Sequence, residues 1–150
     1  MKFRVMQIRP IDPLTLDIIQ LMIIVSQSED FDFVKRLWDD YESGKETYQE
    51  PGAALLGMFK GDSCVAIGGV HKDPYLSEPG IGRIRHVYVM PGYRRRGLGK
   101  LLVEALIDHA AEHFTTLTLR TMTEEASTFY KALGFNDSPR FENATHWMDL

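Results

Sequence analysis

The chain has 150 residues, of which 44% are hydrophobic and 25% charged, enough apolar sequence for one domain with its own core. Its formal net charge of -4 disfavours general binding to nucleic acids or to anionic membranes. The only cysteine, Cys64, cannot form an internal disulfide, and its apolar surroundings predict a buried reduced thiol. With no signal-peptide segment at the start and no apolar run long enough to span a membrane, we expect a cytoplasmic protein.

The first part of the chain predicts one strand and two helices. Residues 3–8 alternate between apolar and polar side chains, which is typical of a strand. Asp12 and Pro13 have the residue types of an N-cap and a first helical position, and the apolar residues that follow form one helix face. Aromatic and aliphatic residues then recur at helical intervals in 28–44, where Gly44 would end a second helix.

The middle of the chain predicts three strands. A turn at 50–52 leads into strands at 53–59 and 63–70, and Gly-Asp at 61–62 between them suggests a hairpin. Prolines and glycines mark 71–82 as a loop. A further strand is expected at 83–89.

The last part of the chain predicts two helices and the remaining strands. An amphipathic helix is expected from Leu98 to about His113, followed by a strand at 115–121. Thr123 is a suitable N-cap for a helix over 124–133, which Gly134 would end.

Short β segments near 135 and at 144–150 would complete the sheet. The resulting order β-α-α-β-β-β-α-β-α-β-β predicts a single α/β (α+β) domain over residues 1–150, with a mixed sheet of about six or seven strands and helices on both faces.

A basic and glycine-rich turn separates the strand at 83–89 from the following helix, with the sequence Arg94-Arg95-Arg96-Gly97-Leu98-Gly99. The first N–H groups of a helix lack partners and lie at the positive end of its dipole, which favours anions. Glycine lets a ligand approach the backbone. The pattern therefore predicts a phosphate site, although turn glycines beside solvated arginines would give the same sequence. It matches neither a Walker loop nor the dinucleotide-binding motif.

Two segments resemble the signatures of GNAT-type N-acetyltransferases. Arg-x-x-Gly-x-Gly at 94–99, after the strand that ends Val-Tyr-Val-Met-Pro at 87–91, is similar to the family's acyl-CoA-binding motif. Phe-Tyr-Lys-Ala-Leu-Gly-Phe at 129–135 resembles the family's tyrosine helix with its Leu-Gly-Phe turn. The resemblance covers about 82–136, and the first eighty residues match only in the order of elements. It implies a GNAT-like fold and direct transfer of an acetyl group from acetyl-CoA to a primary amine.

The resemblance also implies how the chain would hold acetyl-CoA. Backbone N–H groups of the turn would bind the pyrophosphate, with charge added by the arginines. The strand end would offer free backbone groups to the pantetheine arm, and the N–H of Val89 would stabilise the oxyanion of the thioester. The implied cofactor-binding residues are Val87, Tyr88, Val89, Arg94, Arg95, Arg96, Gly97, Leu98, Gly99 and Lys100.

By the same resemblance, Tyr130 would donate a proton to the departing coenzyme A thiolate. A tyrosine on a helix is otherwise a common core-edge residue. Relatives often carry Asn at the position of Thr123, so one cofactor contact differs here.

The general base is left open by the sequence. Relatives often carry an acidic residue in the fourth strand, where this chain has Arg83, Arg85 and His86. His86 has a suitable intrinsic pKa, but it could equally be structural. The other candidates are Glu29, Asp30, Glu78 and a chain of water molecules.

No metal site is predicted, because the histidines do not show a ligand pattern. The acceptor would be an amine-bearing small molecule or peptide, and its cleft could use aromatic residues between Phe31 and Tyr41 unless these pack the core. An alternative is a non-catalytic acyl-CoA sensor. Nucleic-acid binding through the arginines is disfavoured by the acidic total charge. A homodimer is possible, with Phe141 and Trp147 of the terminal segment as aromatic candidates for the contact.

Overall fold

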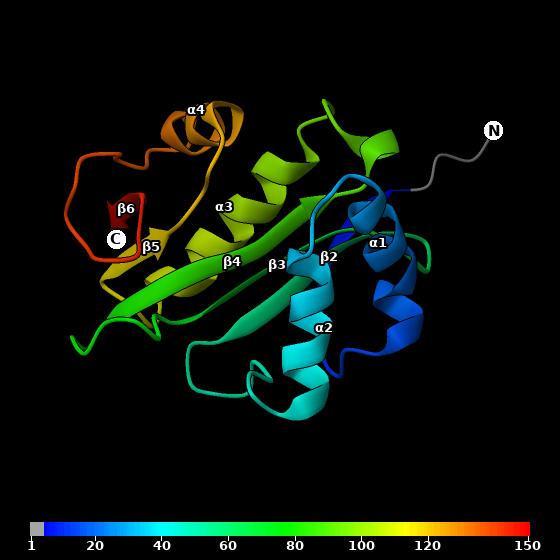
Figure 1. Cartoon of the computed structure of the whole chain (residues 1–150), viewed down its shortest axis with the longest axis horizontal. Helices are drawn as coiled ribbons and strands as arrows, with labels where there is room; N and C mark the ends of the chain where they lie inside the picture. Colours follow the sequence, from blue (N-terminus) through cyan, green and yellow to red (C-terminus); the bar gives the residue numbers. More distant parts are fainter. Residues whose placement is uncertain (1–4) are drawn as a thin grey trace.

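A mixed sheet of six strands forms the centre of the molecule (Figure 1), as seen in a computed structural model that describes residues 5–150. The strands occupy the sheet in chain order, and only β4 and β5 are parallel neighbours. Their bounds are β1 (Met6–Pro10), β2 (Ala54–Lys60), β3 (Ser63–Lys72), β4 (Ile81–Val89), β5 (Thr116–Leu119) and β6 (His146–Asp149).

Helices cover both faces of this sheet, as the order of elements predicted (Figure 1). On one face lie α1 and α2, and on the other lie α3 and α4. Their bounds are α1 (Leu16–Ser28), α2 (Phe33–Ser43), α3 (Leu98–Ala111) and α4 (Glu124–Ala132), with a short 3₁₀ turn at Pro91–Tyr93.

Each face has its own hydrophobic core. Ile19 of α1 and Leu37 of α2 are buried against one face of the central strands, while Leu102 and Leu106 of α3 are buried against the other. Helical spacing of these apolar positions presents a continuous stripe to the sheet. The mixed α/β fold with two covered faces is therefore confirmed.

Two boundaries differ from the sequence prediction. Asp12 is not the N-cap of the first helix, because α1 begins at Leu16 with Thr15 in the N-cap position. The non-helical segment at 11–15 instead packs Ile11 and Leu14 into the core, so burial of these side chains outweighs the local capping pattern. The start of the strand predicted at 3–8 lies partly outside the described residues, and the observed strand continues to Pro10.

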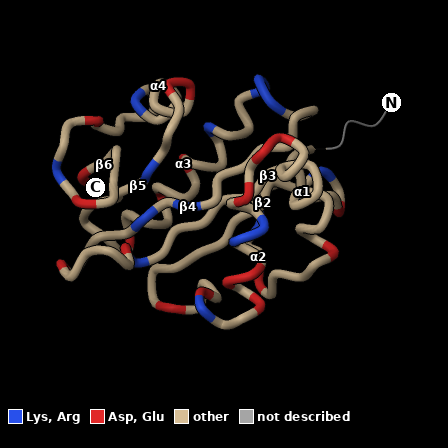
Figure 2. Tube along the Cα trace, viewed as in Figure 1, with Lys and Arg blue, Asp and Glu red and all other residues tan. Residues whose placement is uncertain are grey.

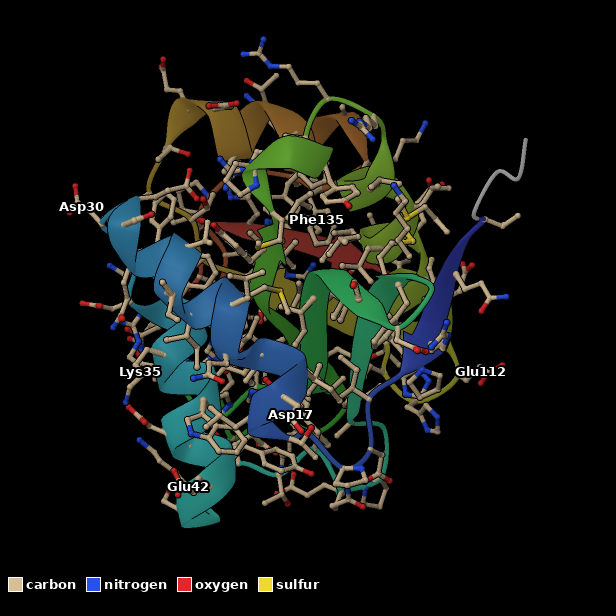
Figure 3. The ribbon with its side chains drawn as sticks, turned by 90° about the vertical axis from the view of Figure 1, so that its right-hand side faces the viewer. Asp17, Asp30, Lys35, Glu42, Glu112 and Phe135 are labelled. Atoms are coloured by element: carbon tan, nitrogen blue, oxygen red, sulfur yellow. The ribbon has the colours of Figure 1, made fainter. Side chains whose placement is uncertain are left out.

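The predicted seventh strand near Phe135 is reduced to one bridge. Asn136 pairs with Trp147 only, and Phe135 itself is buried in the core below α4 (Figure 3). Gly134 stands just after α4 with a φ of 104°, as expected of a helix-ending glycine. Cys64 is half-buried rather than buried, and burial raises the pKa of its thiol to about 12.

Strands β4 and β5 separate soon after they meet. Their parallel pairing runs from Ile81–Thr116 to Arg83–Thr118 and then stops. Beyond that point β4 continues for six residues, paired with β3 alone among the described strands and interrupted by a bulge opposite Gly68. The sheet therefore has an internal opening along the end of β4.

Adjacent leucines on α3 allow a test of this packing. Leu102 is fully buried while Leu101 is 53% exposed. Leu102→Ala should lower the free energy of unfolding by about 2–5 kcal/mol, because it leaves a cavity between α3 and the sheet. Leu101→Ala should change it by less than about 1 kcal/mol. Urea denaturation of both variants measures the difference, and equal losses would contradict the assigned face of α3.

Candidate active site

Two adjoining clefts follow the opening between β4 and β5. The larger, of about 780 Å³, is bounded by β4, the end of β5, α4 and the start of α2. The smaller, of about 350 Å³, lies against the N-terminus of α3. Val89, Arg94, Gly99 and Phe129 border both clefts, so the two form one continuous path.

The glycine-rich turn lines the smaller cleft. Gly97 is the N-cap of α3 and has a φ of 75°, a left-handed conformation that glycine adopts without strain. Arg95 also has a positive φ, of 62°. The turn leads into a helix of 14 residues with no acidic residue in its first turn. Free N–H groups and a positive dipole end therefore face this cleft.

The basic side chains around this turn differ in whether they line the smaller cleft. Arg95 and Lys100 line the smaller cleft, whereas the guanidinium of Arg96 lies over the ring of Tyr93, 5.4 Å from its centroid. The side chain of Leu98 is buried in the core, so only its backbone could contact a ligand.

Arg94 is held by partners within the chain. Its guanidinium donates to both carboxylate oxygens of Glu29, at 2.7 and 2.8 Å, and its Nε donates to the carbonyl of Val89 at 2.9 Å. Tyr88 donates its hydroxyl to the same carboxylate. The hydrogen bond from Arg94 lowers the pKa of Glu29 below its ordinary value. This network joins the end of α1 to β4 and to the turn. The carboxylate of Glu29 balances the charge of Arg94.

The backbone of Val89 is oriented toward the opening. Met90 N donates to Val65 O across the β3–β4 pair, and Val89 stands opposite Ala66. Because the bonding direction alternates along an antiparallel pair, the N–H and C=O of Val89 point away from β3. The bond from Arg94 to the Val89 carbonyl agrees with this direction. The Val89 N–H is thus available at the edge of the cleft.

Tyr130 lies across this opening on α4. Its ring packs against Phe129 and Phe135, with ring centroids 5.0 and 5.7 Å away, and the residue also borders the larger cleft. Burial raises the pKa of its hydroxyl well above the ordinary value, so the phenol keeps its proton at neutral pH. Within residues 5–150 this hydroxyl has no hydrogen-bond partner, which leaves it able to donate to a ligand.

His86 sits at the β4 bulge with a φ of 61° and borders the larger cleft. Burial, the charge of Arg85 and the charges of His71 and Arg36 lower its pKa to about 3, although a hydrogen bond with the Phe33 backbone opposes this. The imidazole is therefore neutral at neutral pH and holds an added proton weakly.

Each of the three acidic candidates for the general base is either paired with another residue or lies outside the clefts. Glu29 is paired with Arg94. Asp30, at the outer end of α1, is exposed and points away from the sheet (Figure 3). Glu78 is exposed in the loop before β4 and borders neither cleft.

Comparison with known proteins finds a family model and solved structures that match most of the chain. The model of the Acetyltransferase (GNAT) family matches residues 21–135. The chain belongs to the GNAT acetyltransferase family. Its fold is also similar to that of a solved protein from Exiguobacterium sp. 255-15, with a TM-score of 0.82, 28% identity and coverage of 97% of this chain and 93% of the other.

Other solved GNAT-type structures are more distant in sequence and share the fold. An acetyltransferase from Streptococcus agalactiae 2603 has a TM-score of 0.76 at 18% identity, covering 99% of this chain and 100% of the other. A curated relative, an uncharacterized protein of Mycobacterium leprae, is 27% identical over 133 residues, which are 82% of this chain. The chain matches 36% of the length of that relative.

Several cleft residues of this GNAT domain were not found from the sequence. Arg36 of α2 and Arg120 at the end of β5 border the larger cleft, and no local motif marks either. The Glu29–Arg94 pair joins positions 65 residues apart. Thr123 caps α4 as predicted, because its hydroxyl accepts a hydrogen bond from Ala126 N at 3.1 Å.

The aromatic residues between Phe31 and Tyr41 lie at the cleft, in the core, or at both. Phe31 and Phe33 border the larger cleft, whereas Trp38 and Tyr41 pack against the core below α1. Within residues 5–150 no group of three or more side chains could hold a metal ion, and no helix there has the length and apolar character to cross a membrane.

The Glu29–Arg94 pair of the GNAT domain gives a pH-dependent prediction. Because its pKa is lowered on folding, Glu29 stabilises the protein above the ordinary Glu pKa, and this contribution is lost as the pH falls through the lowered value. Glu29→Gln should reduce the free energy of unfolding by up to about 1 kcal/mol at neutral pH and by progressively less in acid. Urea unfolding across the acid range measures this, with exposed Glu42→Gln as control. A deficit that did not change with pH would contradict the ionic contribution.

Proposed function

We propose that this GNAT domain transfers an acetyl group from acetyl-CoA to a primary amine by direct nucleophilic attack. The observation that carries the proposal is the continuous path from the α3 N-terminus, along the unpaired edge of β4, to the hydroxyl of Tyr130. Coenzyme A has the parts that such a path would contact in order: a pyrophosphate, an extended amide chain and a thioester.

The phosphate end of the path fits an anion. Backbone N–H groups at 97–100 lie at the positive end of α3, and Arg95 and Lys100 border the same cleft. Gly99 has no side chain there, and a Cβ would stand 3.5 Å from Val89 and 3.6 Å from Phe129. The proposed pyrophosphate contacts are therefore mainly from the backbone, with two cations beside them.

The reaction that we propose uses two groups at the other end. An amine attacks the thioester carbonyl, so that a C–N bond forms while the C–S bond breaks. The N–H of Val89 would donate to the oxygen on which negative charge develops. Tyr130 would donate its proton to the leaving thiolate.

The amine proton would leave through water in the larger cleft. His86 borders that cleft, but with a pKa of about 3 it would accept this proton poorly. We therefore assign the proton to solvent, with the amine arriving in its neutral form.

The alternative is an acyl-CoA sensor without turnover. It is favoured by the missing carboxylate in β4, where relatives often have an acid and this chain has Arg83, Arg85 and His86. Acetyl-CoA binding without acetylation of any amine in a broad panel would support the sensor. The free hydroxyl of Tyr130 favours catalysis.

The acceptor, the location and the assembly also stay predictions. The acceptor would be a small molecule or peptide that bears an amine. We expect the protein to be cytoplasmic, and a homodimer is a further prediction. Trp147 and Phe141 were the reason to expect a dimer, and both rings already lie under the guanidinium of Arg140, at 4.4 and 4.7 Å.

Substitutions at two glycines test the proposed binding of the pyrophosphate at the α3 N-terminus. Gly99→Val should weaken acetyl-CoA binding by more than about tenfold, or about 1.4 kcal/mol, because its added methyl groups extend into the cleft. Its Cβ would make ordinary contacts, so the fold should persist. Gly92→Val is the control, since nothing lies within 4 Å of that site and it borders neither cleft. Calorimetry compares the two, with circular dichroism to verify folding; equal affinities would exclude this binding mode.

A second experiment tests Tyr130 as the proton donor to the leaving thiolate. Tyr130→Phe keeps the ring between Phe129 and Phe135 and should leave stability nearly unchanged. The turnover number should fall about tenfold to a hundredfold, a loss of about 1.4 to 2.7 kcal/mol of transition-state stabilisation, because only the proton donor is removed. The Michaelis constant for acetyl-CoA should stay within a few-fold. Steady-state kinetics with an identified acceptor measures this, and full activity with chemistry rate-limiting would assign the proton to water.

A further inference from the structure

The larger cleft is unusually basic for this chain. Among residues 5–150, five arginines and one acidic residue border it, although the net charge of the chain is -4. Figure 2 shows basic segments on β4 and near the start of α2. The arginines are Arg36, Arg83, Arg85, Arg94 and Arg120, and the acid is Glu125.

Two of these cations are already satisfied by the chain. Arg83 lies 3.5 Å from Asp73 and donates to the carbonyl of Asn143 at 2.8 Å. Arg94 is paired with Glu29. The side chains of Arg36, Arg85 and Arg120 have no hydrogen bond or ion pair with any residue of 5–150.

Arg85 is the least exposed of the three arginines that have no partner among residues 5–150. It stands opposite Gly69 in the β3–β4 pair, so its side chain lies on the same face as that glycine. That face is the one covered by α1 and α2, because a Cβ on Gly69 would meet the ring of Tyr48 at 2.6 Å. Arg85 is half-buried there. A partly desolvated guanidinium without a partner is unfavourable unless a ligand supplies the missing anion.

Arg36 approaches the same region from α2. The charges of both Arg85 and Arg36 help to lower the pKa of His86, so both lie near that imidazole. Two cations from different elements thus converge at the β4 bulge, on the side of the cleft bounded by Phe31 and Phe33.

The phosphates of coenzyme A do not account for these cations. In the proposed binding mode they lie at the α3 N-terminus, which has its own Arg95 and Lys100. Arg85 precedes Val89 by four strand residues, which would span about 13 Å in a regular strand and less across the bulge at His86, and it lies toward the opposite end of the cleft. In the proposed binding mode, Arg85 would therefore lie beyond the thioester, on the side away from the pyrophosphate.

We propose that Arg85 and Arg36 form an anion subsite that binds a carboxylate or phosphate group of the acceptor amine. The inference rests on the proposed acetyl transfer and specifies its substrate class: amines that carry a compact anionic group. Guanidinium groups bind both anions with paired hydrogen bonds, and the shared requirement is negative charge.

Matched acceptors test the substrate class. Amino acids are compared with their carboxamides, and phosphoethanolamine with ethanolamine, by rates of acetyl-CoA-dependent acetylation. At least one anionic member should exceed its neutral partner by about tenfold or more in kcat/KM, the usual size of an ion-pair contribution. The better pair then identifies the anion. Neutral amines that are used as well as, or better than, all anionic ones would overturn the proposal.

Variants test the residues. Arg85→Gln and Arg36→Gln should each reduce the preference for the anionic member, by about tenfold for Arg85, with the Michaelis constant for acetyl-CoA little changed. Arg85→Lys should restore part of the preference, because it keeps the charge without the planar fork. Lys35→Gln is the control: it removes one positive charge next to Arg36, but its side chain pairs with Asp39 and does not border the cleft. An equal loss in Lys35→Gln would indicate a general field and overturn the subsite.

Binding separates this inference from the proposed function. If acetyl-CoA binds and no amine is acetylated, acetyl transfer is wrong, and calorimetry with the same acceptor pairs decides about the subsite. Binding of an anionic member that Arg85→Gln abolishes, while circular dichroism shows an intact fold, would support it. Equal binding of charged and neutral members, or no binding at all, would overturn it.

Discussion

The separation of β4 from β5 is the constraint on which the rest of the site depends. Two parallel strands that pair for only three positions leave backbone groups of the longer strand without a sheet partner, and such groups must bind something polar or stay in water. The bulge at His86 turns β4 at this point, and Tyr130 of α4 borders the gap. Clefts, backbone donors and the phenol come together because the sheet does not close here.

The charged residues around this opening are of two kinds. Arg83 and Arg94 have carboxylate partners from distant segments, Asp73 and Glu29, and these pairs connect β4 to its surroundings. Arg85 and Arg36 have no carboxylate partner in the part of the chain that the structure describes. Paired charges contribute little net stability but fix geometry, whereas unpaired cations in a cleft attract anions. The same residue type therefore has a structural role at some positions of the cleft and a proposed binding role at others.

Local signals in the sequence were sufficient for most of the fold and for the position of the glycine-rich turn before α3. Helical periodicity, Gly44, Gly134 and the Thr123 cap all describe interactions within a few residues. Errors arose where distant packing decides, as at the start of α1. The partners of Arg94 and the convergence of Arg85 with Arg36 could not be predicted, since they depend on how α1 and α2 lie over the sheet.

The same convergence bears on the missing general base. Burial is the largest cause of the low pKa of His86, and the charges of Arg85 and Arg36 add to it. An anion bound to these arginines would offset their repulsion and raise the pKa of the imidazole, but it would leave the larger effect of burial in place. His86 would then remain a weaker base than an ordinary histidine, although a better one than in the unliganded domain. Binding of an anionic amine substrate would thus make His86 a somewhat better base, but still an inefficient one. Water remains the main route for the amine proton.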